Sequence, residues 1–425
     1  MSRHSAYSRD HAALLNTLSN APRLLLIQDL DGVCMGLVRD PLTRRLDRGY
    51  IDAARQLDGS FYVLTNGEHI GSRGVNAIVE QAFVPPEHPR EQGFYLPGLA
   101  AGGVQLQDRR GAVSHPGVSE AELRFLADVP VRATRFLSTL LAGAPFHLEP
   151  HEIATLVGTT VLDNPASPTL NLNALHARLT QAPARYAALQ EAVQAFMQTL
   201  LHEAQAAQLD DAFFVHYAPN LGRDARGDER MKPADATQAG TTDFQFMLKG
   251  AVKEVGVLVI LNHYYYRYTG RWPLGAHFNA RQAPREADAL LQLALAHFDP
   301  ALMPHLVGVG DTVTSQSHTL EDGTETYLRG GSDRGFLTLV QQLGEALGTP
   351  STTVYIDSSG GEVRRPGIDA ELLERAPHAP WEAFAGITDA DDPLQLDVVF
   401  TGGHTQYVAF FRTLAQRRSA RTAGP

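Results

Sequence analysis

The stretch LLLIQDLDGVCMG, residues Leu24–Gly36, decides the fold. The four apolar residues Leu24–Ile27 are typical of a strand that is buried on both faces of a parallel sheet. Asp29 and Asp31 follow almost at once. Two carboxylates at the end of a hydrophobic strand repel each other and are costly to desolvate, so they need a cation, a hydrogen-bond network or open solvent. The stretch therefore predicts an α/β fold that brings two acids to one edge of its sheet.

Two later apolar runs also end in polar residues. Phe61–Gly67 (FYVLTNG) presents Thr65 and Asn66, and Leu306–Gln316 (LVGVGDTVTSQ) presents Asp311. Ligands of an open parallel sheet lie beyond the carboxyl ends of its strands, so we expect these side chains to meet Asp29 and Asp31 there. A hard dication would relieve the repulsion between the converging carboxylates, and Mg²⁺ prefers such oxygen ligands. The pattern predicts a magnesium site.

The composition narrows the range of partners. The 425-residue chain is 44% hydrophobic and carries a net charge of −11, which argues against nucleic acid or an anionic membrane as a partner. The lone Cys34 excludes an intramolecular disulfide. The N-terminal residues lack the apolar core of a signal peptide, and the longest apolar run, Val255–Leu261, is too short to span a bilayer. We expect a cytoplasmic protein that acts on a small molecule; the sequence makes no prediction of oligomeric state.

The order of the segments predicts a Rossmann-like core interrupted by a second unit. Residues 1–117 would form the first part of the core, residues 118–240 an inserted α+β cap, and residues 241–425 the second part of the core. Within this division, Asn220–Gly240 is polar and rich in glycine, which is typical of a linker. The segment that starts at Thr241 carries a capping signal and predicts a long buried helix running to Gly270, with a strand as the alternative for its C-terminal half.

Three short strings carry a resemblance to a known superfamily. DLDGV, LTNG and GVGDT, in this order, resemble the first, second and fourth motifs of the haloacid dehalogenase-like (HAD) phosphatases, which insert a large α/β cap between their second and third motifs. Longer strings, such as QDLDGVCMGLVRDPLTRRLD, FYVLTNGEH and HYAPNLGRD, resemble the glucosylglycerol-phosphate phosphatase family of bacterial osmolyte synthesis. The short motifs occur in very many phosphatases, whereas the longer strings are much more specific and extend the likeness over essentially the whole chain.

The resemblance implies a role for each residue at the predicted sheet edge. Asp29 would attack phosphorus and form an aspartyl-phosphate, and Asp31 would protonate the leaving oxygen and then activate water. Thr65 would hydrogen-bond the phosphoryl group. Asp29, the backbone carbonyl of Asp31 and Asp311 would hold Mg²⁺.

Two features of the implied site have alternatives. The third motif of the superfamily requires a cation, for which Lys249 in KGAVKEV is the best match and Lys253 and Arg281 are rivals. Many relatives also carry an acid four positions after the aspartate of the fourth motif, where this chain has Ser315. Either Ser315 holds the metal through water, or another acid such as Asp333 supplies the charge.

The implied substrate is glucosylglycerol 3-phosphate. Asn66, Asn220 and Arg223 are candidates to bind it, although HYAPNLGRD is equally compatible with a capped turn. The aromatic segment Tyr264–Trp272 is a second candidate for the sugar site, against the more frequent structural role of such residues in a core. Alternative functions are a phosphatase of a trehalose-, sucrose- or mannosylglycerate-type phosphate, a phosphomutase, and a non-catalytic sensor of sugar phosphates.

Overall fold

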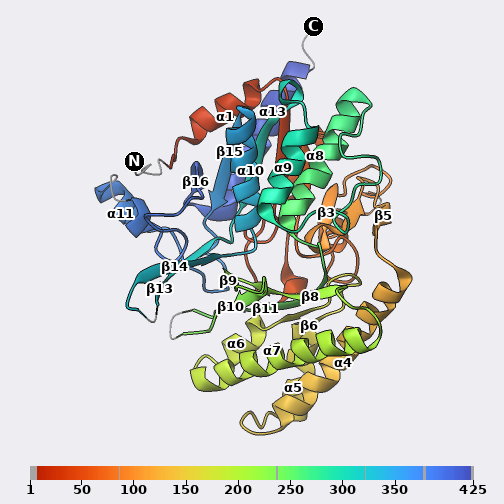
Figure 1. Cartoon of the computed structure of the whole chain (residues 1–425), viewed down its shortest axis with the longest axis vertical. Coiled ribbons are helices and arrows are strands. Elements are labelled where there is room, and N and C mark those ends of the chain that lie inside the picture. The colour runs from red at the N-terminus through yellow and green to blue at the C-terminus, as the bar shows by residue number, and fades with distance from the viewer. Residues whose placement is uncertain (1–6, 86, 236–237, 321, 377–379, 423–425) are drawn as a thin grey trace.

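The computed structural model of the chain describes residues 7–85, 87–235, 238–320, 322–376 and 380–422 (Figure 1). Its main sheet has eight strands in the order β16-β15-β12-β1-β2-β3-β4-β5. The strands are β1 (Leu24–Gln28), β2 (Phe61–Leu64), β3 (Gly98–Ala100), β4 (Gln105–Gln107), β5 (Val113–Ser114), β12 (His305–Gly310), β15 (Ser351–Ile356) and β16 (Val398–Phe400). The six from β16 to β3 are parallel, and β4 and β5 are antiparallel. The predicted α/β class is confirmed.

Strand β1 lies inside this sheet, between β12 and β2, and its side chains alternate between two cores. Leu25 and Ile27 pack on one face, and Leu24 and Leu26 on the other. The first face is covered by α8 (Lys253–Thr269), α9 (Ala287–His297) and α10 (Arg334–Leu347), and the second by α1 (His11–Asn20), α2 (Arg48–Gln56) and α13 (Gly403–Thr422) (Figure 1). All five positions of β1 are buried, and burial on both faces explains why its first four residues are apolar without a break.

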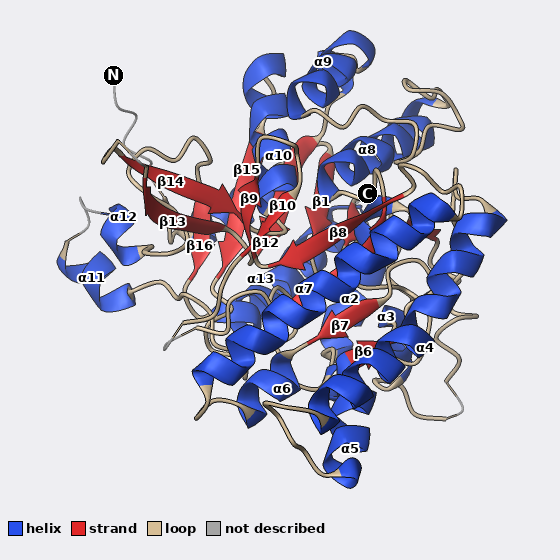
Figure 2. Cartoon of the chain, turned by 60° about the horizontal axis from the view of Figure 1, so that its bottom comes forward, coloured by secondary structure: helices blue, strands red, loops and turns tan. Residues whose placement is uncertain are grey.

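A second layer, the cap, lies at the bottom of Figure 1 and comes forward in Figure 2. It is a four-stranded antiparallel sheet in the order β6-β7-β11-β8, covered by four helices. The strands are β6 (Val161–Leu162), β7 (Thr169–Asn171), β8 (Phe213–Ala218) and β11 (Asp243–Leu248); the helices are α4 (Glu120–Ala142), α5 (Pro150–Thr160), α6 (Asn173–Arg178) and α7 (Pro183–Ala206). The cap faces the carboxyl edge of the parallel strands.

The helix predicted from Thr241 is wrong in its first half. Asp243–Leu248 is strand β11, which pairs with β7 on one side and β8 on the other, and the helix begins only at Lys253. The alternation of Phe244 and Phe246 with polar neighbours is a strand pattern, which tertiary pairing enforces. Since β11 lies in the cap sheet, the predicted boundary at Gly240 falls before the last cap strand.

The segment predicted as a linker also forms structure. Asn220–Arg223 (β9) and Glu229–Met231 (β10) pair as a hairpin that lies beside a second hairpin, β13 (Thr314–Thr319) with β14 (Glu325–Gly330). Short elements complete the described chain: α3 (Val75–Glu80), α11 (Ala370–Arg375), α12 (Pro380–Ala383) and the 3₁₀ turns Pro41–Thr43, Ala101–Gly103 and Pro300–Leu302. Within the described ranges, every helix is too short or too polar to cross a membrane.

Candidate active site

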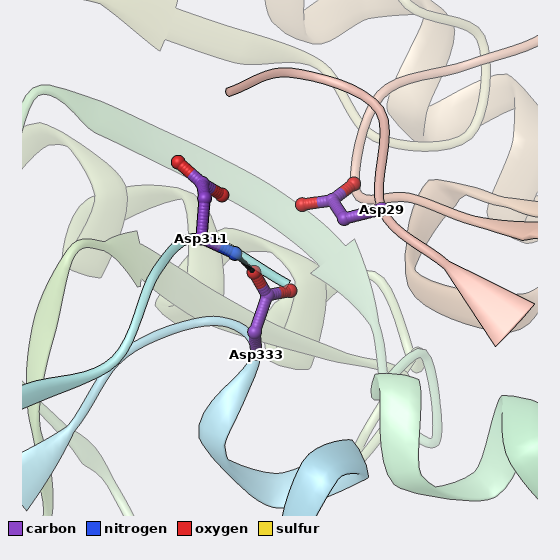
Figure 3. Close-up of side chains that lie close together, drawn as sticks. All are labelled: Asp29, Asp311 and Asp333. Atoms are coloured by element: carbon purple, nitrogen blue, oxygen red, sulfur yellow. Dashed lines mark hydrogen bonds between the residues drawn. The ribbon is translucent and has the colours of Figure 1, made fainter. Parts of the chain in front are cut away.

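Three buried aspartates converge at the carboxyl edge of the main sheet (Figure 3). Asp29 directly follows β1 and Asp311 directly follows β12. Because these parallel neighbours are in register at Gln28 and Val309, the two acids leave the sheet within one residue of the same level. Asp333, the residue before α10, completes the group, and one carboxylate oxygen from each residue lies within 4.8 Å of the others. The structure therefore brings Asp29 and Asp311 close together, as the sequence predicted.

The cation at these aspartates is Lys253, in the first turn of α8. Its side chain is buried, and its Nζ lies 2.6 Å from Asp29 Oδ2 and 2.6 Å from Asp333 Oδ1. The preference for Lys249 is corrected, because the Lys249 ammonium pairs with Asp211 away from the site. Arg281 is also excluded from this position, since its guanidinium bonds to Glu122.

Burial and mutual repulsion control the charges of this cluster. Burial raises the pKa of Asp29 to about 7, although Lys253 opposes the shift. Burial, followed by repulsion from Asp333 and Asp29, raises the pKa of Asp311 well above its usual range. Burial alone would lower the pKa of Lys253, but Asp29 and Asp333 outweigh it and raise the pKa instead. One ammonium thus faces three carboxylates, which leaves the cluster deficient in positive charge.

The cluster fits a bound Mg²⁺. Asp311 Oδ2 is buried and has no hydrogen-bond partner among the residues that the structure describes, as expected of an oxygen that awaits a cation. Gly32 leaves room beside it: a Cβ there would lie 2.0 Å from that oxygen. Oxygen-only donors of this kind suit a hard dication.

The structure also separates the two candidates for the second acid. Asp333 Oδ2 accepts the backbone N–H groups of Asp311 at 2.9 Å and Thr312 at 3.0 Å, so it holds the loop after β12. The hydroxyl of Ser315 instead donates to Asp389, a residue outside the aspartate group. Asp333 is therefore the acid that joins Asp29 and Asp311.

A cavity of about 120 Å³ opens beside Asp29, several times the space that one water needs. Asp31, Thr65 and Asn66 line it, as predicted. Asp31 Oδ2 lies 3.0 Å from Nη1 of Arg44, which also lines the cavity. Thr65 is buried, and its Oγ1 accepts the N–H of Gly67 at 3.2 Å. The cavity therefore brings the carboxylate of Asp31 and the hydroxyl of Thr65 to the side of Asp29.

The cap closes this cavity with one polar face of its sheet. Thr169 and Asn171 of β7 and Asp243 and Gln245 of β11 line it, whereas the alternate residues Leu170, Phe244 and Phe246 pack into the apolar core. Asn171 Nδ2 donates to Asp243 Oδ1 at 2.6 Å. This face offers hydrogen-bonding groups and no large apolar surface.

The other predicted substrate residues have structural contacts. Asn66 Nδ2 donates to Nε2 of His216 on β8 at 2.8 Å, and His216 Nδ1 lies 2.9 Å from Glu229. Asn220 and Arg223 do not line the Asp29 cavity but an adjacent pocket. Asn220 Oδ1 accepts the N–H of Gly222 within its own hairpin and, at 3.1 Å, that of Gly331 in the core, so it ties the two units together.

Comparison of the sequence with known proteins decides the family. The sequence model of the glucosylglycerol-phosphate phosphatase family matches residues 23–415. The chain belongs to the glucosylglycerol-phosphate phosphatase family. A curated relative from Synechocystis sp., named glucosylglycerol-phosphate phosphatase, is 51% identical over 416 residues, which are 97% of each chain. The resemblance inferred from the sequence strings is confirmed.

Solved structures similar to this family member include two fungal trehalose-6-phosphate phosphatases. The Aspergillus fumigatus protein is 10% identical with a TM-score of 0.38, and covers 97% of this chain and 99% of its own. The Candida albicans C-terminal domain is also 10% identical, with a TM-score of 0.46 and the same coverage.

Several cavity residues of this glucosylglycerol-phosphate phosphatase family member were not predicted from its sequence. Asp243 and Gln245 were hidden by the helix predicted from Thr241, although the alternation in DFQF was a usable strand signal. Arg44 and Arg365 reach the cavity from loops, for which no periodic signal exists. The aromatic segment Tyr264–Trp272, the second candidate for the sugar site, does not line the cavity, and Tyr264 is buried in the core.

Proposed function

We propose that this chain hydrolyses glucosylglycerol 3-phosphate to glucosylglycerol and phosphate. The observation that supports the chemistry best is the position of Lys253, whose ammonium joins Asp29 to Asp333. Beside it lies the Asp311 oxygen that has no hydrogen-bond partner in the described part of the chain. Membership of the family and the name of the Synechocystis relative support the choice of substrate.

In the proposed reaction, Asp29 attacks phosphorus while the bond to the glycerol oxygen breaks, giving an aspartyl-phosphate. Asp31 gives its proton to the departing oxygen. The resulting carboxylate then takes a proton from the water that hydrolyses the aspartyl-phosphate. Arg44, 3.0 Å from Asp31, orients this carboxylate toward the cavity, and Thr65 hydrogen-bonds the phosphoryl oxygens. Lys253 opposes the rise in the pKa of Asp29 that burial causes, and it holds the Asp29 carboxylate in position.

Mg²⁺ completes the proposed site. Asp29, Asp311, Asp333 and the backbone carbonyl of Asp31 are its proposed ligands. When bound, the ion neutralises the acids and the negative charge that develops on the phosphoryl group.

The proposed setting is compatible-solute synthesis in the cytoplasm, with a small sugar phosphate as the partner. We further propose that the chain divides into a HAD core, residues 1–117 and 249–425, and a cap, residues 118–248, whose end follows from the position of β11 in the cap sheet.

The test is phosphate release from purified protein with Mg²⁺, with glucosylglycerol 3-phosphate compared with trehalose, sucrose and mannosylglycerate phosphates. We expect the highest kcat/KM with glucosylglycerol 3-phosphate. A higher value with another of these esters would overturn the substrate, and an isomerised sugar phosphate as product would indicate a mutase. Binding without release of phosphate from any ester would indicate a sensor.

A further inference from the structure

Arg365 lines the active cavity, and its guanidinium has no partner among the residues that the structure describes. Arg365 lines the cavity that contains Asp29, its Nε is buried, and no hydrogen bond or ion pair engages it among the described residues. Arg365 as a whole is half-buried, and a charge withdrawn from water without a counter-charge is costly to desolvate. Arginine cannot escape this cost by losing its proton. The site is therefore incomplete without an anion.

The loop that carries Arg365 is held in place by the core. Asp357, the residue after β15, accepts the N–H of Ser359 at 2.9 Å and that of Ile368 at 2.8 Å, so its two oxygens tie together both ends of the loop. The neighbouring Arg364 is exposed. The loop thus directs one arginine into the cavity and the other outward.

Two carboxylates, one from the cap and one from the core, attract the charge of Arg365. Burial lowers the pKa of Arg365, and this shift is opposed by Asp243 of the cap and then by Asp311 of the core. Neither forms an ion pair with the guanidinium within the described part of the chain. Asp311 is a proposed magnesium ligand, so its charge is committed to the metal. Arg365 of the core and Asp243 of the cap are therefore a cation and an anion that both line the cavity without pairing with each other.

Asp243 is one of several groups that suit hydroxyl groups. Its Oδ1 accepts Asn171 Nδ2, and Oε1 of the adjacent cavity residue Gln245 is buried with no hydrogen-bond partner among the described residues. A carboxylate with two amides and the hydroxyl of Thr169 provides donors and acceptors close together, which a neutral polyol can satisfy and a phosphate dianion cannot.

We propose that Arg365 and Asp243 form a substrate clamp with divided roles: Arg365 binds the phosphoryl group, and Asp243, with Asn171 and Gln245, binds the hydroxyl groups of the glucosylglycerol moiety. The clamp rests on the proposed function for the identity of its ligand. It orients the ester with phosphorus at Asp29 and the polyol against the cap sheet. In the clamp, the phosphoryl group of the bound substrate also neutralises the charge of Arg365.

The test measures binding of the two products separately, without turnover, to the full chain with Mg²⁺. Calorimetry with inorganic phosphate should show an affinity loss of about tenfold or more for Arg365→Gln, because the variant loses a charge-assisted contact to phosphate. Arg365→Lys should restore part of it, and Arg364→Gln, the adjacent exposed control, should bind phosphate like the parent chain. Asp243→Asn should lose about tenfold in affinity for glucosylglycerol and less than threefold for phosphate.

The outcomes separate the clamp from the overall function. Unchanged phosphate affinity in Arg365→Gln, or equal losses of both ligands in both variants, would overturn the clamp even if the parent chain is an active phosphatase. Phosphate affinity that depends on Arg365, in a chain that hydrolyses no ester, would overturn the proposed function but keep the phosphoryl half of the clamp. Thermal unfolding of each variant identifies a general loss of fold, and Arg365→Lys keeps the test decisive if Arg365→Gln does not fold.

Discussion

The ammonium of Lys253 lies 2.6 Å from the Asp29 carboxylate and is buried with it at the end of β1. The two residues are far apart in sequence, and the packing of α8 against the main sheet brings them into contact. In this pair, Lys253 opposes the rise in pKa that burial causes at the proposed nucleophile. It also distinguishes Lys253 from Lys249, whose partner is Asp211.

Replacement of Lys253 should therefore remove activity far more than replacement of Lys249. Lys253→Met leaves the carboxylates of Asp29 and Asp333 without their cation, and we expect kcat to fall by about 10²–10³, the range for loss of one preorganised electrostatic contact. Lys249→Met is the matched control and should keep kcat within about threefold. Because breaking a buried ion pair also destabilises the fold, Tm is measured for both, and Lys253→Arg retains the charge. Equal kinetic losses in the two methionine variants would contradict the assignment.

Asp29→Asn should abolish turnover while the fold is retained. The change removes the nucleophile but conserves the shape of the side chain, and loss of a covalent catalyst typically costs several orders of magnitude in rate. Asp31→Asn is the paired variant: it should still form the aspartyl-phosphate from p-nitrophenyl phosphate, a substrate with a good leaving group, but hydrolyse it slowly. Mass spectrometry detects the trapped adduct. An adduct on Asp29→Asn, after deamidation is excluded, would disprove the nucleophile.

Chelation of divalent metal should stop phosphate release, and Mg²⁺ should restore it. We expect Asp311→Asn to raise the Mg²⁺ concentration for half-maximal activity by about tenfold or more, since it removes the charge of the unpartnered buried oxygen. Asp128→Asn, on the exposed surface, should not shift it. Ca²⁺ should inhibit, because it accepts more ligands at longer distances and could occupy both Asp29 oxygens. Full activity after exhaustive chelation would contradict the proposed magnesium site.

His69, four residues after Thr65, should make the fold sensitive to acid. Its Nε2 donates to Gly98 O and its Nδ1 accepts from Gln107, so the neutral ring is the bound form, and burial lowers its pKa from 6.5 to about 4. The folded pKa lies below the unfolded one. The neutral ring's contribution is thus complete above pH 6.5 and is lost as the pH falls toward 4. It amounts to at most about 3 kcal/mol.

Urea unfolding of the parent chain and of His69→Gln at a series of pH values measures this contribution. The difference in free energy of unfolding between the two chains should shrink as the pH falls from about 6.5 to 4. His151→Gln, at an exposed position, controls for loss of any histidine. A difference that stays constant over this range would show that His69 does not titrate on unfolding.

Asn220 and Arg223 should differ in their effect on stability. Asn220 is buried and bonds to Tyr217, Glu229, Gly222 and Gly331, so Asn220→Ala leaves several groups unpaired and should lower the free energy of unfolding by about 2 kcal/mol or more. Arg223 is exposed, and Arg223→Ala should cost less than about 1 kcal/mol. Thermal or urea unfolding measures both. If stable variants selectively lose hydrolysis of glucosylglycerol 3-phosphate, Asn220 and Arg223 contribute to substrate binding after all.

The sequence by itself determined the α/β class and the positions of Asp29, Asp31, Thr65 and Asp311. An apolar run that stops at an acid indicates a buried parallel strand and the position of its carboxyl end. The pattern can be recognised because strand geometry and burial depend on only a few consecutive residues. The register of β1 with β12 then follows from packing both runs in one sheet. These signals are local, so they can be recognised in the sequence without the tertiary structure.

Only the tertiary structure decided between Lys249 and Lys253, and between Ser315 and Asp333. Each choice depends on how a loop turns and on which helix end reaches the cluster. Gly250, with a φ of +85°, turns the chain between β11 and α8, which leaves Lys249 at the end of the cap strand and places Lys253 in the first turn of the core helix. The same holds for β11, where strand pairing with β7 and β8 overrode a helical capping signal. Contacts between residues so distant in the chain leave no periodic pattern in the sequence. The energies of these contacts determine the structure where local propensity does not.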